Sequence, residues 1–151
     1  MTVTVRLTTA AEPMFAGAAA LFDEYRQYYG ANPAPHTVVA EWMLEQVLSS
    51  HARIYAGAID GVAQGICSVA VAPAALALRT VWLIRDLYVA PTARRHGVAR
   101  ALITQVAEDA RVAGAHRLSL QTETANVRAI ELYARSDFSV ITDVAVMDRM
   151  L

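Results

Sequence analysis

The segment from Val89 to Leu102 reads V-A-P-T-A-R-R-H-G-V-A-R-A-L and joins an apolar strand to an amphipathic helix through an arginine-rich loop. Pro91 ends the strand because its nitrogen cannot donate to a β-ladder. The helix is predicted from apolar residues at helical spacing, namely Ala99, Leu102, Ile103, Val106, Ala107 and Ala110. Any fold proposed for this chain must therefore contain a strand–loop–helix unit at this point.

The loop of this unit has the features of an anion site. A helix start presents unpaired backbone N–H groups and the positive end of the helix dipole, both of which favour phosphate. Gly97 lets the backbone approach a ligand closely, and Arg94, Arg95 and Arg100 can form paired hydrogen bonds to phosphate oxygens. The alternative is a solvated, arginine-rich helix start. Neither G-x-G-x-x-G nor G-x-x-x-x-G-K-[ST] occurs in the chain.

Composition favours one globular domain over residues 1–151, since 56% of the 151 residues are hydrophobic and can form a core. The net charge of −1 argues against nucleic acid or an anionic membrane as a partner. The single Cys67 excludes an intramolecular disulfide and fits a reducing cytoplasm. The apolar run at residues 14–22 is too short to span a bilayer. We expect no signal peptide, no transmembrane helix and no metal site.

Periodicity and turn residues predict an alternation of strands and helices. Strands are expected at residues 2–7, 53–58, 62–71, 81–89 and 117–121, and helices at 11–29, 37–48, 98–113 and 126–135, with Thr37 as a cap. Residues 73–78 form a loop, and residues 138–141 and 144–147 form a terminal hairpin. The order β-α-α-β-β-β-α-β-α-β-β mixes antiparallel hairpins with one βαβ crossover, which indicates an α+β fold with a mixed sheet.

Two motifs resemble those of the GNAT superfamily, the Gcn5-related N-acetyltransferases. Arg94, Gly97 and Ala99 form R-x-x-G-x-A, which is similar to the family's pyrophosphate-binding pattern Q/R-x-x-G-x-G/A. The segment T-A-N-V-R-A-I-E-L-Y-A-R-S-D-F at residues 124–138 resembles N-x-x-A-i-x-l-Y-x-x-x-G-F, with Asn126, Ala129, Ile130, Leu132, Tyr133 and Phe138 in register. The departure is Asp137, which stands where glycine is usual; aspartate tolerates positive φ better than most residues.

The resemblance covers residues 2–150 and implies a fold and an activity. The fold would have a mostly antiparallel mixed sheet of six to seven strands and about four helices. The activity would be direct transfer of an acetyl group from acetyl-CoA to an amine, without a covalent enzyme intermediate. A homodimer would also be expected.

The resemblance further implies which residues bind coenzyme A. The backbone of Leu87, Tyr88 and Val89 would bond the pantetheine, with a β-bulge in this strand freeing the donors. The pyrophosphate would lie on the loop and helix start formed by Arg94, Arg95, His96, Gly97, Val98, Ala99 and Arg100, where His96 would act through its backbone. In the second motif Asn126, Ala129 and Tyr133 would approach the cofactor. For Asn126 the alternative is a plain helix cap.

Two side chains are candidates for the chemistry. The resemblance implies that Tyr133 is the general acid near the sulfur; the alternative is a core tyrosine. Asp86 is the candidate base for the amine, and strand alternation predicts that it shares a face with Trp82, Ile84 and Tyr88. A carboxylate on an apolar face usually has a functional or structural role, because burying a charged group without a partner costs free energy. The alternative for Asp86 is a structural salt bridge.

The acceptor amine is expected to contact the first helix. Tyr25, Tyr28 and Tyr29 form an aromatic stripe beside Asp23 and Glu24, and aromatic faces with carboxylates suit a cationic amine. The alternative is a core stripe flanked by solvated charge. The segments Y-R-Q-Y-Y and W-L-I-R-D-L-Y-V resemble a GNAT subgroup that includes fungal histone and polyamine acetyltransferases. That resemblance favours a polyamine, an amino acid or a lysine side chain.

Two other functions compete with an acetyltransferase. One is a non-catalytic acyl-CoA-binding or regulatory module on the same fold, which loss of the tyrosine or the loop would favour. The other is an arginine-mediated nucleic-acid binder, against which the net charge and the lack of a long basic face argue.

Overall fold

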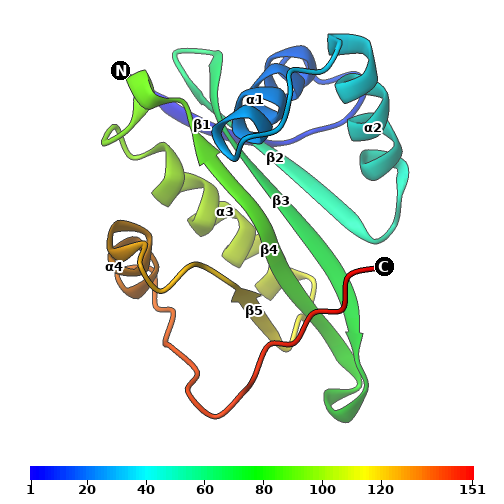
Figure 1. The fold of residues 1–151 in the computed structure, drawn as a ribbon, viewed down its shortest axis with the longest axis vertical. Helices are drawn as coiled ribbons and strands as arrows, with labels where there is room; N and C mark the ends of the chain where they lie inside the picture. The colour runs from blue at the N-terminus through cyan, green and yellow to red at the C-terminus, as the bar shows by residue number, and fades with distance from the viewer. The chain divides into compact units, whose positions relative to one another are not determined.

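A computed structural model describes residues 1–151, and the chain divides into two units, Met1–Gln121 and Thr122–Leu151 (Figure 1). The second unit contains α4 (Val127–Ala134). The first unit contains every other element: β1 (Val3–Leu7), α1 (Phe15–Tyr28), α2 (His36–Leu48), β2 (Ala52–Ile59), β3 (Val62–Ala74), the 3-10 turn η1 (Ala75–Ala77), β4 (Arg79–Val89), the 3-10 turn η2 (Pro91–Ala93), α3 (Val98–Val112) and β5 (Arg117–Leu120).

The five strands form one sheet in chain order, β1-β2-β3-β4-β5. The first four strands pair antiparallel, and β4 pairs parallel with β5 through the α3 crossover. The β2–β3 hairpin closes at Asp60 and Gly61, both of which have positive φ, as a tight hairpin turn requires. The predicted α+β class with a mixed, mostly antiparallel sheet is confirmed.

Helices lie on both faces of the sheet. The pair α1 and α2 packs together and contacts β3 and β2, whereas α3 packs on the other face (Figure 1). A Cβ atom added at Gly57 of β2 or at Gly65 of β3 would lie 2.8 Å from Cγ1 of Val98. These two glycines therefore let the first turn of α3 sit directly on the strands, which fixes where the arginine-rich loop ends.

The apolar stripe of α3 is nearly the one predicted. Its buried residues are Val98, Leu102, Ile103, Val106 and Ala110. Ala107 was expected in the stripe but is exposed, and Val98 takes a place at the start of the stripe. A residue close to the edge of a helical stripe is buried only where the sheet reaches it. Helix α2 also differs from prediction: it begins at His36 after Pro35, so Thr37 is not its cap.

The predicted terminal hairpin at residues 138–141 and 144–147 is wrong, and the sheet has five strands instead of six or seven. Residues 139–151 form no helix or strand, and the apolar residues there are exposed. Alternating apolar residues favour an extended chain, but a strand forms only when its backbone groups find a partner. An isolated two-stranded hairpin is marginal in water. None of the helices combines the length and apolar content needed to cross a membrane.

We expect Gly65→Ala to destabilise the protein by about 1–3 kcal/mol, the usual range for overpacking a core. The new methyl group would meet Val98 Cγ1 at 2.8 Å and the Tyr88 carbonyl oxygen at 3.1 Å, and neither is the end of a flexible side chain. Urea unfolding measures the change. Ala72→Val, at an exposed position of the same strand, is the control and should change stability by less than about 0.5 kcal/mol. Equal effects of the two substitutions would contradict the close contact with α3.

Candidate active site

A β-bulge in β4 determines which way Asp86 faces. Ser68 of β3 pairs with Asp86 and the next residue, Val69, pairs with Ile84, so Arg85 is an extra residue on β4. One extra residue reverses the side-chain alternation of the strand beyond it. The bulge expected in this strand is therefore present.

The bulge corrects one expectation from strand alternation. Tyr88 faces α1, because its hydroxyl donates to Glu24 Oε1 at 2.7 Å, and Asp86 lines pockets with residues of α1 and α2. Trp82 faces the other way: its ring lies 4.6 Å from the guanidinium of Arg53. Arg53 is on the α3 face of β2, because it alternates in step with Tyr55, whose hydroxyl donates to Asp109 of α3. Asp86 thus shares a face with Tyr88 but not with Trp82 or Ile84.

Asp86 is held by a hydrogen bond from a neighbouring strand. The hydroxyl of Ser68, which is 8% exposed, donates to Asp86 Oδ2. Asp86 forms no ion pair, so the salt-bridge alternative for this carboxylate is not found. Burial, and secondly the charge of Asp86, raises the pKa of the adjacent Cys67 thiol. Cys67 is therefore protonated at neutral pH and is a poor nucleophile.

Two pockets meet at Asp86. The larger, which we call the helix pocket, has a volume of about 390 Å³ and lies between α1, α2 and β4. The smaller, the sheet pocket, has a volume of about 220 Å³ and lies over β2, β3 and β4. Both are lined by Trp42 and Asp86. The helix pocket is otherwise mainly apolar and aromatic, through Phe22, Tyr25, Ala34, Val38 and Val39, with Arg26 as its one basic residue.

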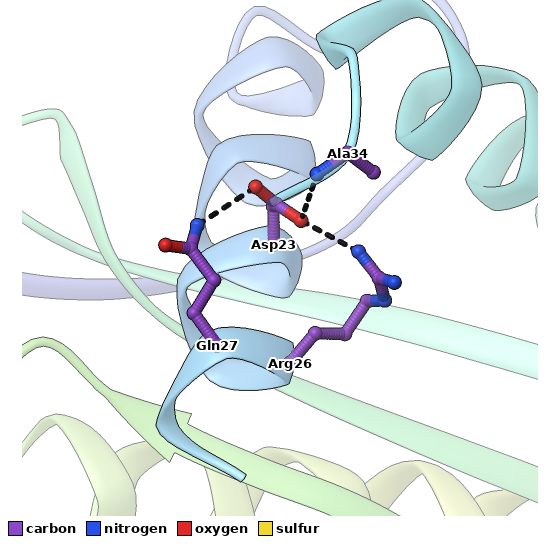
Figure 2. A network of polar contacts seen from close by, with 4 residues as sticks. All are labelled: Asp23, Arg26, Gln27 and Ala34. Carbon is purple, nitrogen blue, oxygen red and sulfur yellow. Dashed lines mark hydrogen bonds and ion pairs between the residues drawn. The ribbon is translucent and has the colours of Figure 1, made fainter. Parts of the chain in front are cut away.

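An aspartate network fixes the wall of the helix pocket. Asp23 Oδ1 accepts from Arg26 Nη1 at 2.6 Å and from the backbone nitrogen of Ala34 at 3.2 Å, and Oδ2 accepts from Gln27 Nε2 at 2.9 Å (Figure 2). Arg26 and Ala34 both line the pocket, one from α1 and one from the connection to α2. Asp23 therefore ties that connection to α1 and is engaged in holding the pocket's shape.

The tyrosines of α1 form a cluster with Tyr88. Ring centroids lie 5.8 Å apart for Tyr25 and Tyr88 and 6.2 Å apart for Tyr28 and Tyr88. Of Tyr25, Tyr28 and the C-cap residue Tyr29, only Tyr25 lines the helix pocket; Tyr28 and Tyr29 are 63% and 62% exposed. The stripe is therefore not a core stripe, and two of the three tyrosines expected to contact the acceptor lie outside the helix pocket.

Burial and the hydrogen bond to Glu24 raise the pKa of Tyr88 to about 12. Glu24, like Asp23, is thus committed to a partner within the protein. Both carboxylates beside the tyrosine stripe stabilise the structure around the pocket, which leaves Asp86 as the carboxylate that lines it.

The loop before α3 has the geometry of an anion site. Gly97 has a φ of 85° at the N-cap position and no side chain caps the helix. The N–H groups of Val98, Ala99 and Arg100 have no acceptor in the protein. Arg95 also has a positive φ of 65°. His96, Gly97, Arg95 and Arg100 are exposed at this helix start, so the loop is open to a ligand.

Arg94 contacts the end of β4 and two tyrosine rings. Its Nε donates to the Val89 carbonyl oxygen at 3.1 Å, and its guanidinium lies 5.8 Å from the ring centroids of Tyr28 and Tyr88. The arginine of the R-x-x-G-x-A motif therefore links the loop to the end of β4 and to α1.

The end of β4 is unpaired on one side within the first unit. The parallel partner β5 pairs only with residues 81–84, from Val81↔Arg117 to Ile84↔Leu120. Residues 85–89, which include Leu87 and Val89, have only β3 as a neighbouring strand. The backbone expected to bond pantetheine is thus free of a strand on the β5 side.

The second unit carries the other motif. Asn126 caps α4, since its Oδ1 accepts from the Ala129 nitrogen at 3.2 Å. The rings of Tyr133 and Phe138 meet edge to face with centroids 5.9 Å apart. Asp137 has a φ of 65°, the left-handed conformation that glycine usually supplies at this motif position. The chain thus keeps the helix end of the motif despite the substitution.

Sequence reasoning missed several residues of the two pockets. Ser68 and Trp42 were not singled out by any expectation, and Arg26 and Arg85 stood inside the segments Y-R-Q-Y-Y and W-L-I-R-D-L-Y-V without an expected role. Ser68 reaches Asp86 through strand register, which is not visible in the sequence. The sequence feature that could have indicated these pockets was the charged pair Arg85-Asp86 within an otherwise apolar strand.

Comparison with known proteins identifies the family. The model of the acetyltransferase (GNAT) family matches residues 18–138, and the chain belongs to this family of N-acetyltransferases. A Bacillus subtilis (strain 168) protein, the uncharacterized N-acetyltransferase YhfO, is 29% identical over 124 residues, which are 82% of each chain.

Solved structures show the same fold. A probable acetyltransferase has a TM-score of 0.87 at 24% identity, covering 100% of this chain and 98% of its own. An aminoglycoside acetyltransferase, meta-AAC0020 from an uncultured soil metagenomic sample, has a TM-score of 0.82 at 15% identity, with 99% and 96% covered. The ribosomal-protein-alanine N-acetyltransferase of Brucella melitensis biovar Abortus 2308 has a TM-score of 0.81 at 17% identity, with both chains fully covered.

We expect Asp23→Ala to loosen the connection between α1 and α2, because it removes the acceptor for Arg26, Gln27 and the Ala34 nitrogen at once. Hydrogen exchange should show faster exchange at Ala34. Glu108→Gln is the control: Glu108 also pairs with an arginine three residues away, but its partner Arg111 lies on the same exposed helix turn. Unchanged exchange at Ala34 in Asp23→Ala would contradict the network's role.

The raised pKa of Tyr88 predicts a loss of stability in alkali. The neutral phenol is favoured in the folded state, so this contribution is complete below the ordinary pKa of 10.0 and disappears as pH rises to about 12. Unfolding measured across this window should show a smaller loss for Tyr88→Phe than for the wild type. Buried Tyr55, whose pKa is also raised, is unchanged in that variant and serves as the internal reference. Identical pH profiles would contradict the assignment.

Proposed function

We propose that this protein transfers an acetyl group from acetyl-CoA to a primary amine of a small molecule or peptide, with polyamines, amino acids and lysine side chains as the acceptor classes. The observation that carries the proposal is the position of Asp86 on β4. It lies at the junction of two pockets, three residues before the end of the strand that leads into the anion-type loop. Three strand residues span about 10 Å.

The residues present fit coenzyme A. Three unpartnered N–H groups at the start of α3, the left-handed Gly97 and the exposed Arg95 and Arg100 would hold the pyrophosphate. The unpaired side of residues 85–89 offers backbone groups of Leu87, Tyr88 and Val89 to the pantetheine amides. When bound, acetyl-CoA supplies an activated thioester. Asn126 and Ala129 are proposed cofactor contacts on the basis of their motif positions.

The proposed side-chain roles rest on the position of Asp86 at the two pockets and on the motif position of Tyr133. Asp86 would receive a proton from the bound ammonium, so that the neutral amine nitrogen can attack the thioester carbonyl carbon as the C–S bond breaks. Ser68 keeps the Asp86 carboxylate in place. Tyr133 would donate a proton to the departing sulfur. The attacking nitrogen loses its second proton to solvent, and proton exchange with solvent returns Asp86 to the carboxylate and Tyr133 to the phenol. Each ammonium and thioester consumed thus yields one amide, one thiol and one released proton.

The same proposal covers the protein's location, domain organisation, oligomeric state and partners. We place the protein in the cytoplasm as one domain over residues 1–151 that acts as a homodimer on a soluble amine, with no nucleic acid and no membrane as partner. The single Cys67, which is buried and free, and the net charge of −1 support this setting. The helix pocket is large enough for a small amine or an amino-acid side chain.

Coenzyme A release from acetyl-CoA across a panel of polyamines, amino acids, aminoglycosides and lysine peptides tests the proposal. We expect Tyr133→Phe and Asp86→Asn each to lower kcat/KM by about a hundredfold, the lower part of the range for general acid–base groups. Asp148→Asn, at an exposed position near the end of the chain, is the control and should match the wild type.

Two outcomes would contradict the proposed roles. Full activity of Asp86→Asn would exclude that carboxylate as the base. Binding of acetyl-CoA without turnover of any amine would favour the acyl-CoA-binding module instead.

A further inference from the structure

The charged residues that line the two pockets at Asp86 do not suit a polycationic acceptor. Asp86 is the one carboxylate among the lining residues, whereas Arg26 lines the helix pocket and Arg85 lines the sheet pocket. A spermidine-like molecule bound through one ammonium at Asp86 would bring its other ammonium groups close to these guanidinium groups. Like charges in a partly desolvated pocket repel, so the lining opposes such a ligand.

Arg26 and Arg85 differ in whether their charge is paired within the protein. Arg26 is ion-paired with Asp23 at 2.6 Å, which offsets its charge. Arg85 has no ion pair and its guanidinium has no hydrogen-bond partner in the protein. Arg85 is an exposed residue that lines the same sheet pocket as Asp86, although two residues adjacent in a regular strand would ordinarily face opposite ways. An unpaired cation and an anion thus line one small pocket side by side.

We infer, on the basis of the proposed function, that the acceptor is an amine that also carries a carboxylate and an apolar side chain, as an apolar α-amino acid does. Its ammonium binds Asp86 and its carboxylate binds the Arg85 guanidinium, which can donate two parallel hydrogen bonds. Its side chain enters the helix pocket against Phe22, Val39 and Trp42. The product would be the N-acetyl amino acid.

The shape of the pockets agrees with this assignment. The helix pocket is walled by aromatic and aliphatic side chains and is bounded by the connection that Asp23 holds in place. Phe22 and Trp42 meet edge to face with ring centroids 5.5 Å apart, which gives the wall a fixed aromatic surface. Transfer of an apolar side chain from water to such a surface is favourable, whereas a polyhydroxylated polycation would gain little from it.

Binding measured by isothermal titration calorimetry tests this inference without relying on turnover. The probes are L-phenylalanine, L-phenylalaninamide, which keeps the amine and the ring but lacks the carboxylate, spermidine and sisomicin. We expect L-phenylalanine to bind at least about tenfold more tightly than the amide, as expected for a charge-assisted pair. Arg85→Gln should remove this difference and Arg85→Lys should keep part of it.

Arg79→Gln is the matched control, because Arg79 is an exposed arginine of the same strand that lines neither pocket. It should leave the preference for the free acid unchanged. Equal binding of acid and amide to the wild type, tighter binding of spermidine or sisomicin, or the same loss in Arg79→Gln would each overturn the inference.

Transfer to the same four probes separates this inference from the proposed function. If spermidine or sisomicin is acetylated and L-phenylalanine is not, the acetyltransferase assignment stands and the carboxylate-bearing acceptor is wrong. If L-phenylalanine binds through Arg85 and no probe releases coenzyme A, acetyl transfer to this acceptor is wrong and the pocket is a binding site. Acetylation of L-phenylalanine that falls in Arg85→Gln through KM, with little change in kcat, supports both.

Discussion

The extra residue at Arg85 is the feature on which the rest of the site depends. A regular β4 would turn Asp86 toward α3 and into the apolar core, where a carboxylate would lack a partner. The bulge instead brings Asp86 to the face covered by α1 and α2, opposite Ser68, and places Arg85 beside it. It also coincides with the end of pairing to β5, so that the same short stretch has free backbone on one side and a carboxylate on the α1–α2 face.

The two halves of the proposed reaction are joined through the sheet. On one face, Gly57 and Gly65 allow Val98 to approach the strands and so locate the start of α3 and its anion-type loop. On the other face, the Asp23 network and the Tyr88–Glu24 bond hold α1 over β4. Arg94 connects these parts, because it contacts the Val89 carbonyl oxygen and lies over Tyr28 and Tyr88. The helix pocket and the anion-type loop therefore adjoin the same strand, β4.

The carboxylates of this chain differ in their hydrogen-bond partners and in whether they line a pocket. Asp23, Glu24 and Asp109 each accept hydrogen bonds from residues that position a helix. Asp86 accepts one from Ser68 and still lines both pockets. The sequence did not distinguish these carboxylates from one another. Asp23 and Glu24 were expected beside the substrate, but in the structure both accept hydrogen bonds from other residues of the protein.

The family and most of the helices and strands could be predicted from the sequence. The R-x-x-G-x-A loop, the second motif around Tyr133 and the 3.6-residue periodicity of α3 are local patterns, and local patterns predict local structure. The strand register, and with it the bulge, the face of Asp86 and its hydrogen bond from Ser68, depends on how the folded strands pair. So does the absence of strands at residues 138–147. Register and pairing depend on residues far apart in the chain, such as Ser68 and Asp86, and no local pattern contains that information.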